Sequence, residues 1–156
     1  MAANKNLLQN VYLFKSLTAD QIGTIGAAAR LETYSAGDDI FAQGDKAKAL
    51  YIIKYGSVRI LQKTASGDSI EVATLGTGSH FGEMAFVDGE PRSASAAAVE
   101  KSEIVILDYE KLSTVLKGDV AIASSLYKEL AHFLCGRLRI TTNDLSFARE
   151  KNLSHF

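Results

Sequence analysis

Between residues 30 and 108 the chain is divided into short segments rich in β-branched and aromatic residues, separated by glycine or aspartate. Such segments bounded by turn-forming residues are typical of β-strands. Residues 94–99 would be helical on propensity alone, but their neighbours are strands, so we assign them to a strand. Many short strands at near-regular spacing predict an antiparallel sandwich or roll. The predicted strands are 30–34, 39–41, 49–55, 57–63, 69–75, 94–99 and 102–108.

Helical patterns flank this β-rich region on its N-terminal side. Thr18-Ala19-Asp20-Gln21 has the order of a capping box, in which the threonine and glutamine side chains bond each other's backbone amides. Ile22, Ile25 and Ala29 then recur at helical spacing. A further short helix is expected over residues 6–13.

Two helices are expected after the β-rich region. Asp108 is placed to cap a helix over 109–117, and Gly118 to end it. Asp119 then opens a long helix that is expected to run to about residue 150. The predicted fold class is therefore α+β: an antiparallel, jelly-roll-like β-roll over 30–108, flanked by N-terminal helices over 1–29 and a long C-terminal helix.

Size and charge restrict the functional classes that this chain can belong to. Its 156 residues fit a single domain with a sizeable core. A formal net charge of −1 argues against a broad nucleic-acid surface. No apolar run approaches the roughly 20 residues that cross a membrane, and the N-terminus lacks a signal-peptide layout. The single cysteine, Cys135, favours a reducing compartment, so we expect a cytoplasmic protein.

Metal binding and catalysis have little support in the sequence. His132 and Cys135 lie three apart on a predicted helix, but no second pair completes a ligand set. We therefore interpret them as a helix-face histidine and a packed cysteine. No nucleophile–base set, paired-acid motif or phosphate-binding P-loop is present, so the chain is not expected to be an enzyme or to need a cofactor.

The segment HFGEMAFVDGEPRSAS (residues 80–95, the 80–95 segment below) carries the clearest functional signal. Gly82 permits a close backbone approach, and the amides that follow it can face an anion. Arg92 adds a planar fork of donors that suits phosphate oxygens. The small residues after Arg92 leave room for a ligand. A turn, a helix cap and a surface arginine would be the purely structural interpretation.

Glu83 narrows the choice of ligand. A carboxylate beside a phosphate is unfavourable unless it accepts a hydrogen bond from a hydroxyl of the same ligand. A nucleoside 3′,5′-cyclic phosphate has one free ribose hydroxyl and one singly charged phosphodiester. Glu83 and Arg92 match these two groups, so the 80–95 segment is predicted to bind a cyclic nucleotide.

These residues resemble the cyclic nucleotide-binding domain family of bacterial activators, cyclic nucleotide-dependent kinases and gated channels. The family's phosphate-binding cassette is similar to Phe81-Gly82-Glu83-Met84-Ala85 followed by Pro91-Arg92-Ser93-Ala94-Ser95. The glycine-punctuated stretch over 37–60 is similar to the family's roll. Gly78-Ser79-His80 departs from the Gly-Asp that the family often has there. His80 is expected to be packed by its neighbours rather than to serve catalysis or pH sensing.

The resemblance implies a role for each matching position. Glu83 would bind the ribose 2′-hydroxyl and Arg92 an exocyclic phosphate oxygen. Phe81 belongs to the same motif; the amides of Gly82, Met84 and Ala85 would contact sugar and phosphate, and Ser93 would add a hydroxyl or amide. Apolar residues of the roll would line the base and ribose pocket; the candidates are Ile60, Val72 and Leu75.

The resemblance also bears on the base and on assembly. Residues 135–145 are similar to the dimer helix of the bacterial activators, in which a Thr-Ser pair reaches the adenine, the second hydroxyl coming from the partner subunit. Thr141 and Thr142 match that pair and favour cyclic AMP and a homodimer through residues 119–150, although both could be solvent-facing helix residues. In kinase-type relatives a hydroxyl at the position of Ser93 goes with guanine, whereas bacterial activators carry serine there and use cyclic AMP, so cyclic GMP stays open.

The expected function is a non-catalytic cyclic nucleotide sensor, one domain over residues 1–156, acting on an unknown effector protein. The chain stops near where the activators' DNA-binding module would begin, so no nucleic-acid binding by this chain alone is expected. Met1 favours a stand-alone sensor over a regulatory fragment of a transcription regulator, kinase or channel. A degenerate domain that serves as an interaction module is the further alternative.

Overall fold

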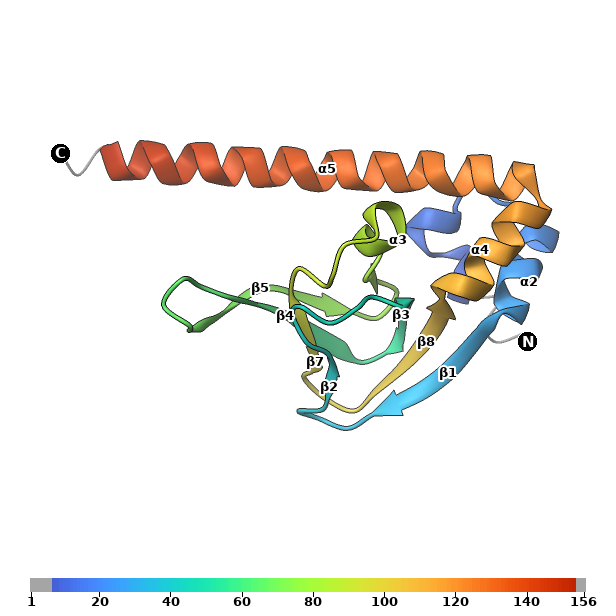
Figure 1. Ribbon diagram of the computed structural model, residues 1–156, viewed down its shortest axis with the longest axis horizontal. Helices are drawn as coiled ribbons and strands as arrows, with labels where there is room; N and C mark the ends of the chain where they lie inside the picture. Colours follow the sequence, from blue (N-terminus) through green and yellow to red (C-terminus); the bar gives the residue numbers. More distant parts are fainter. Residues whose placement is uncertain (1–6, 154–156) are drawn as a thin grey trace.

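The computed structural model describes residues 7–153 and contains two four-stranded antiparallel sheets packed as a roll, with helices on one side (Figure 1). One sheet has the strand order β1-β8-β3-β6 and the other β2-β7-β4-β5. The strands are β1 Ala29–Tyr34, β2 Asp39–Phe41, β3 Ala49–Tyr55, β4 Ser57–Lys63, β5 Ser69–Gly76, β6 His80–Phe81, β7 Ser95–Ala98 and β8 Ser102–Asp108. The helices are the 3₁₀ helix η1 Tyr12–Phe14 and the α-helices α2 Ala19–Ala27, α3 Met84–Asp88, α4 Tyr109–Gly118 and α5 Val120–Leu153.

The predicted fold class is confirmed, and the strands lie where the glycine and aspartate breaks place them. The two-residue strand β6 was not predicted. It pairs with β3, with His80 opposite Ile52 and Phe81 opposite Tyr51. This pairing joins the start of the 80–95 segment to the first sheet.

The central strands β3 and β8 are buried on both faces, because one face of their sheet meets the other sheet and the opposite face meets the helices. In β8, Ile104 and Ile106 pack between the sheets, whereas Val105 and Leu107 pack against the helices. The alternation follows from the period of two in a strand. These two strands therefore form a packed layer next to the start of the 80–95 segment.

The small residues after Arg92 serve two purposes. Ser93 and Ala94 border a cavity, whereas Ala96, Ala97 and Ala98 lie in β7 and are at most 3% exposed. β7 runs between β2 and β4, where large side chains would not fit in the closely packed layer. The alanine run is a strand, as its neighbours indicated.

The N-terminal helices pack on the first sheet. The capping box of α2 is confirmed: Gln21 N donates to Thr18 Oγ1 at 3.2 Å, and Thr18 N donates to Gln21 Oε1 at 2.9 Å. Ahead of it, residues 7–9 are helical and η1 follows; residue 6 of the predicted helix lies outside the described residues. Leu8, Phe14 and Ile25 are fully buried in this helical core.

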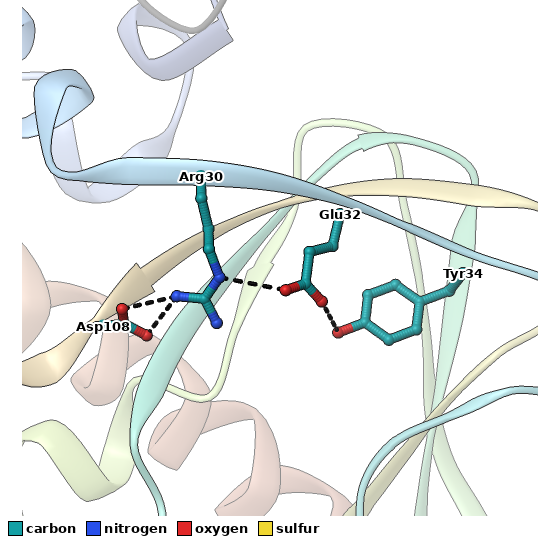
Figure 2. A network of polar contacts seen from close by, with 4 residues as sticks. All are labelled: Arg30, Glu32, Tyr34 and Asp108. Atoms are coloured by element: carbon teal, nitrogen blue, oxygen red, sulfur yellow. Dashed lines mark hydrogen bonds and ion pairs between the residues drawn. The ribbon is translucent and has the colours of Figure 1, made fainter.

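Asp108 occupies the N-cap position of α4, as predicted, but its side chain makes no capping bond. Its carboxylate instead accepts both of its hydrogen bonds from Arg30 Nη1, at 2.6 Å each. Figure 2 shows that Arg30 also donates a hydrogen bond to Glu32, and that the Tyr34 hydroxyl donates one to the other carboxylate oxygen of Glu32. Arg30, Glu32 and Tyr34 are alternate residues of β1 and so share one face of this strand. The network links the edge strand β1 to the end of β8.

The predicted boundary between the last two helices is correct. Gly118 is the last residue of α4, and Asp119 Oδ1 accepts from Ile122 N at 3.1 Å. The first part of α5 packs on the core through Ile122, Leu126 and Leu130, which are at most 2% exposed. Beyond Leu134 the helix is exposed and extends past α3 (Figure 1). Within residues 7–153, no helix is long and apolar enough to span a membrane.

Candidate functional site

A cavity of about 860 Å³ lies between the 80–95 segment, the β4–β5 hairpin and α5. Its size falls within the range of small-molecule sites. Most of the predicted site residues line it. They are Ile60, Leu75, Phe81, Gly82, Glu83, Met84, Ala85, Arg92, Ser93 and Thr141.

Two predicted residues do not line the cavity. Val72 is 53% exposed, and its neighbour Ala73 occupies the lining instead. Because Val72 and Leu75 are three residues apart in one strand, their side chains leave opposite faces, so the prediction that both line the pocket was wrong for Val72. Thr142 is outside the lining, whereas Thr141 is within it. The contact predicted for Thr142 through a partner subunit stays a prediction.

Gly82 turns the chain from β6 into α3 with φ of 81°, a conformation that favours glycine. A Cβ at this position would lie 2.8 Å from Arg92 Nη1 and 3.2 Å from the Ala49 carbonyl oxygen. Glycine is therefore favoured at position 82 for two reasons: the positive φ, and the lack of space for a Cβ atom. Met84 and Ala85 follow in the first turn of α3, where backbone N–H groups lack partners within the helix.

Arg92 is only 6% exposed and is held by backbone carbonyl groups rather than by a carboxylate. Nη2 donates to Ala49 O at 2.6 Å, and Nη1 donates to Gly82 O at 3.0 Å. The guanidinium stacks over the Phe41 ring, 4.1 Å from its centroid. Nε is buried and has no hydrogen-bond partner in residues 7–153. A buried cation with a free donor, lining a cavity, is suited to an anion.

Glu83 is 8% exposed and also lines the cavity. It stands at the N-cap position of α3 but makes no capping bond, so its carboxylate is not used to stabilise the helix. His80 Nδ1 lies 3.7 Å from Glu83 Oε1. One short turn thus provides a buried acceptor and a buried cationic donor to the same cavity.

Tyr109 connects this site to α4 and was not predicted. Its hydroxyl donates to the carbonyl oxygen of Gly82 and accepts from Arg92 Nη1 at 3.3 Å. Burial raises the pKa of the Tyr109 phenol, although Arg92 acts in the opposite direction. The phenol therefore stays protonated at neutral pH and serves as a donor. A tyrosine following a strand has no feature in the sequence that signals this contact.

Helix α5 covers one side of the cavity with Phe133, Leu134 and Arg137. His132, by contrast, is exposed and lies 3.7 Å from Glu129. Cys135 is also exposed, so its interpretation as a packed cysteine was wrong: its helix has left the core at that point. Among the described residues, no group of three or more histidine, cysteine, aspartate or glutamate side chains could hold a metal ion.

The comparison with protein families decides the assignment. The family model for the cyclic nucleotide-binding domain matches residues 31–119, more than half of the chain. The chain belongs to the cyclic nucleotide-binding domain family. The match contains the β-roll, the whole 80–95 segment and α4.

Individual relatives agree with the family. The cyclic AMP receptor protein of Thermus thermophilus is 34% identical over 143 residues, which cover 90% of this chain and 64% of that protein. Human cGMP-dependent protein kinase 2 is 30% identical over 129 residues, covering 75% of this chain and 17% of the kinase. The crystal structure of the Thermus thermophilus catabolite activator protein matches with a TM-score of 0.78 and 32% identity, over 87% of this chain and 62% of that one. The chain thus spans less than two thirds of each of these relatives.

Proposed function

We propose that this cyclic nucleotide-binding domain is a non-catalytic sensor of cyclic AMP. The observation that carries the proposal is that Glu83 and Arg92 are both buried and both line the same cavity. Arg92 would bind the phosphodiester through its free Nε, and Glu83 would accept from the ribose 2′-hydroxyl. The N–H groups of Gly82, Met84 and Ala85 and the hydroxyl of Ser93 would complete the shell.

Adenine is preferred over guanine in this proposal because of α5. Thr141 lines the cavity and would bond the base. Its neighbour Thr142 is exposed and would reach the base that is bound by a partner subunit. Ser93, which lines the cavity as well, supports cyclic GMP as the second candidate. The relatives include both a cyclic AMP receptor and a cGMP-dependent kinase, so family membership leaves this choice to experiment.

Signalling would proceed by a population shift. Bound nucleotide would favour the arrangement in which α4 and α5 close on the roll. Two contacts support this coupling: Tyr109 joins α4 to Gly82 and Arg92, and Phe86 of α3 stacks on Tyr127 of α5 at 6.1 Å between ring centroids. The changed position of α5 would be the signal read by an effector protein. A cytoplasmic location is part of this proposal, in keeping with the single cysteine.

A homodimer through α5 also belongs to the proposal. Leu126, Phe133, Ile140 and Phe147 are spaced seven residues apart. The first two pack on this domain, whereas Ile140 and Phe147 are 60% and 68% exposed. An apolar seam that continues beyond its own domain is suited to a second copy of the same helix.

Calorimetric titration of the nucleotide-free protein with cyclic AMP and cyclic GMP in parallel tests the function. We expect micromolar or tighter binding of cyclic AMP. Arg92→Ala should weaken it at least tenfold, since charge-assisted bonds contribute about 1.5–3 kcal/mol. Arg92→Lys keeps the positive charge but not the planar fork of donors, so its cyclic AMP affinity should lie between those of the wild type and Arg92→Ala. Arg59→Ala, an exposed arginine outside the cavity, is the matched control. No heat with either nucleotide, from folded protein, would instead support an interaction module.

A further inference from the structure

His80 is a buried polar residue in the cavity whose hydrogen bonds are not made by the chain. Its side chain is 4% exposed. Both ring nitrogens are buried and have no hydrogen-bond partner within residues 7–153. Buried polar atoms are nearly always paired, so an unpaired imidazole that lines a ligand cavity indicates a role in that site.

The surroundings of His80 define what it can do. On one side Nδ1 lies 3.7 Å from Glu83 Oε1, just beyond hydrogen-bond distance. On the other side the Phe133 ring of α5 lies 4.4 Å away between centroids, tilted by 56°. Its partner in β3 is the uncharged Ile52. The other charged or titratable groups that line the same cavity are Tyr12 of η1, Asp88 of α3, Glu90 and Arg92 of the 80–95 segment, and Arg137 of α5.

We propose that His80 is a positioning residue for Glu83, and that it thereby sets the affinity for the ribose 2′-hydroxyl. This inference rests on the proposed function. A rotation of either side chain brings Nδ1–H within bonding distance of Oε1. The bond fixes the carboxylate while the other carboxylate oxygen accepts from the ribose. The Phe133 ring packs against the imidazole, so α5 contributes to the orientation of Glu83 through His80.

Two variants and two ligands test the proposal. His80→Phe keeps an aromatic ring against Phe133 but removes both nitrogens. His80→Asn keeps a donor near the position of Nδ1. The control is His132→Phe, because His132 also lies three residues and 3.7 Å from a glutamate but is exposed and outside the cavity. The affinity of each protein for cyclic AMP and for 2′-deoxy cyclic AMP is measured by calorimetry, and its folding is checked by thermal melting.

For cyclic AMP we expect His80→Phe to lose about fivefold to tenfold in affinity, the effect of about one hydrogen bond. His80→Asn should recover part of this affinity. For 2′-deoxy cyclic AMP, which gives Glu83 no hydroxyl, His80→Phe should match the wild type within about twofold.

Three results would overturn the proposal. Equal losses for both nucleotides in His80→Phe would mean that His80 only packs the cavity. Unchanged cyclic AMP affinity in His80→Phe would remove His80 from the site and reject this inference alone. If the wild type binds neither nucleotide, the proposed function fails and this inference with it.

Discussion

The hydroxyl of Tyr109, the first residue of α4, donates a hydrogen bond to the carbonyl oxygen of Gly82. The same hydroxyl accepts from Arg92 Nη1, so one side chain contacts both the turn and the cation of the nucleotide site. The Tyr109 ring also packs on Phe86 of α3, 5.2 Å between centroids. Any movement of α4 therefore acts directly on the residues that we propose to bind phosphate.

Tyr109→Phe tests this coupling. The ring and its packing on Phe86 are kept, and only the hydroxyl is lost. We expect a loss of about 1 kcal/mol in the free energy of unfolding, because the partly buried Gly82 carbonyl group loses a donor. Cyclic AMP affinity should fall, since Arg92 is less firmly held. Urea denaturation and calorimetric titration measure the two effects. Wild-type values for both would show that the hydroxyl contributes nothing.

The same hydroxyl predicts a loss of stability at alkaline pH. Burial raises the pKa of Tyr109 above its ordinary value of 10.0, so folding favours the protonated phenol. The stability that this contributes is fully present below pH 10 and is lost as the pH rises through the folded-state pKa. Absorbance of ionised tyrosine, followed against pH in the wild type and Tyr109→Phe, should show one fewer late-titrating phenol in the variant. Identical late titrations would contradict the assignment.

Gly82→Ala and Gly89→Ala separate backbone strain from steric exclusion. Both glycines have positive φ, 81° and 70°. A Cβ at Gly89 would meet nothing within 4 Å, whereas one at Gly82 would press on Arg92. We expect each to lose about 1–2 kcal/mol of stability through the left-handed backbone. Only Gly82→Ala should also lose cyclic AMP affinity, by at least about tenfold if Arg92 is displaced. Equal affinity in both variants would show that Arg92 accommodates the extra methyl group.

Much of this fold could be read from the sequence because its strands are short and closed by glycine or aspartate. The capping box at Thr18 and the break at Gly118 were equally local signals, and both are present in the structure. Glu83 and Arg92 could be predicted as a pair because the 80–95 segment is contiguous. Both residues of this one segment line the cavity.

The predictions that failed depend on long-range packing. Asp108 does occupy the N-cap position of α4, but the distant Arg30 bonds its carboxylate, so the expected side-chain cap is not formed. The register of β5 decides that Ala73 rather than Val72 faces the cavity, and a short apolar run does not reveal its register. Tyr109 and Phe41 reach Arg92 only through the folded roll. None of these contacts has a periodic or local signal.

The network of Arg30 and Asp108 should affect stability but not ligand binding. Its side chains are 46% and 31% exposed, and neither residue lines the cavity. A double-mutant cycle of Arg30→Met and Asp108→Asn should give a coupling of about 0.5–1 kcal/mol in the free energy of unfolding, the usual range for exposed pairs. The coupling should shrink in high salt. Cyclic AMP affinity should stay within about twofold of the wild type, within the scatter expected for additive, distant sites. A larger change would mean that β1 communicates with the nucleotide site.

The exposed end of α5 predicts how the protein assembles. Ile140 and Phe147 continue the seam that Leu126 and Phe133 begin, so replacing both with serine should convert a dimer into a monomer. Leu145 is also exposed but lies on a different flank of the helix, so Leu145→Ser is the control; Leu138 is left unchanged because it lines the cavity. Light scattering with and without cyclic AMP gives the mass of each. A monomeric wild type in both conditions would remove the dimer from the proposal, and dissociation of the control alone would move the interface to the other flank.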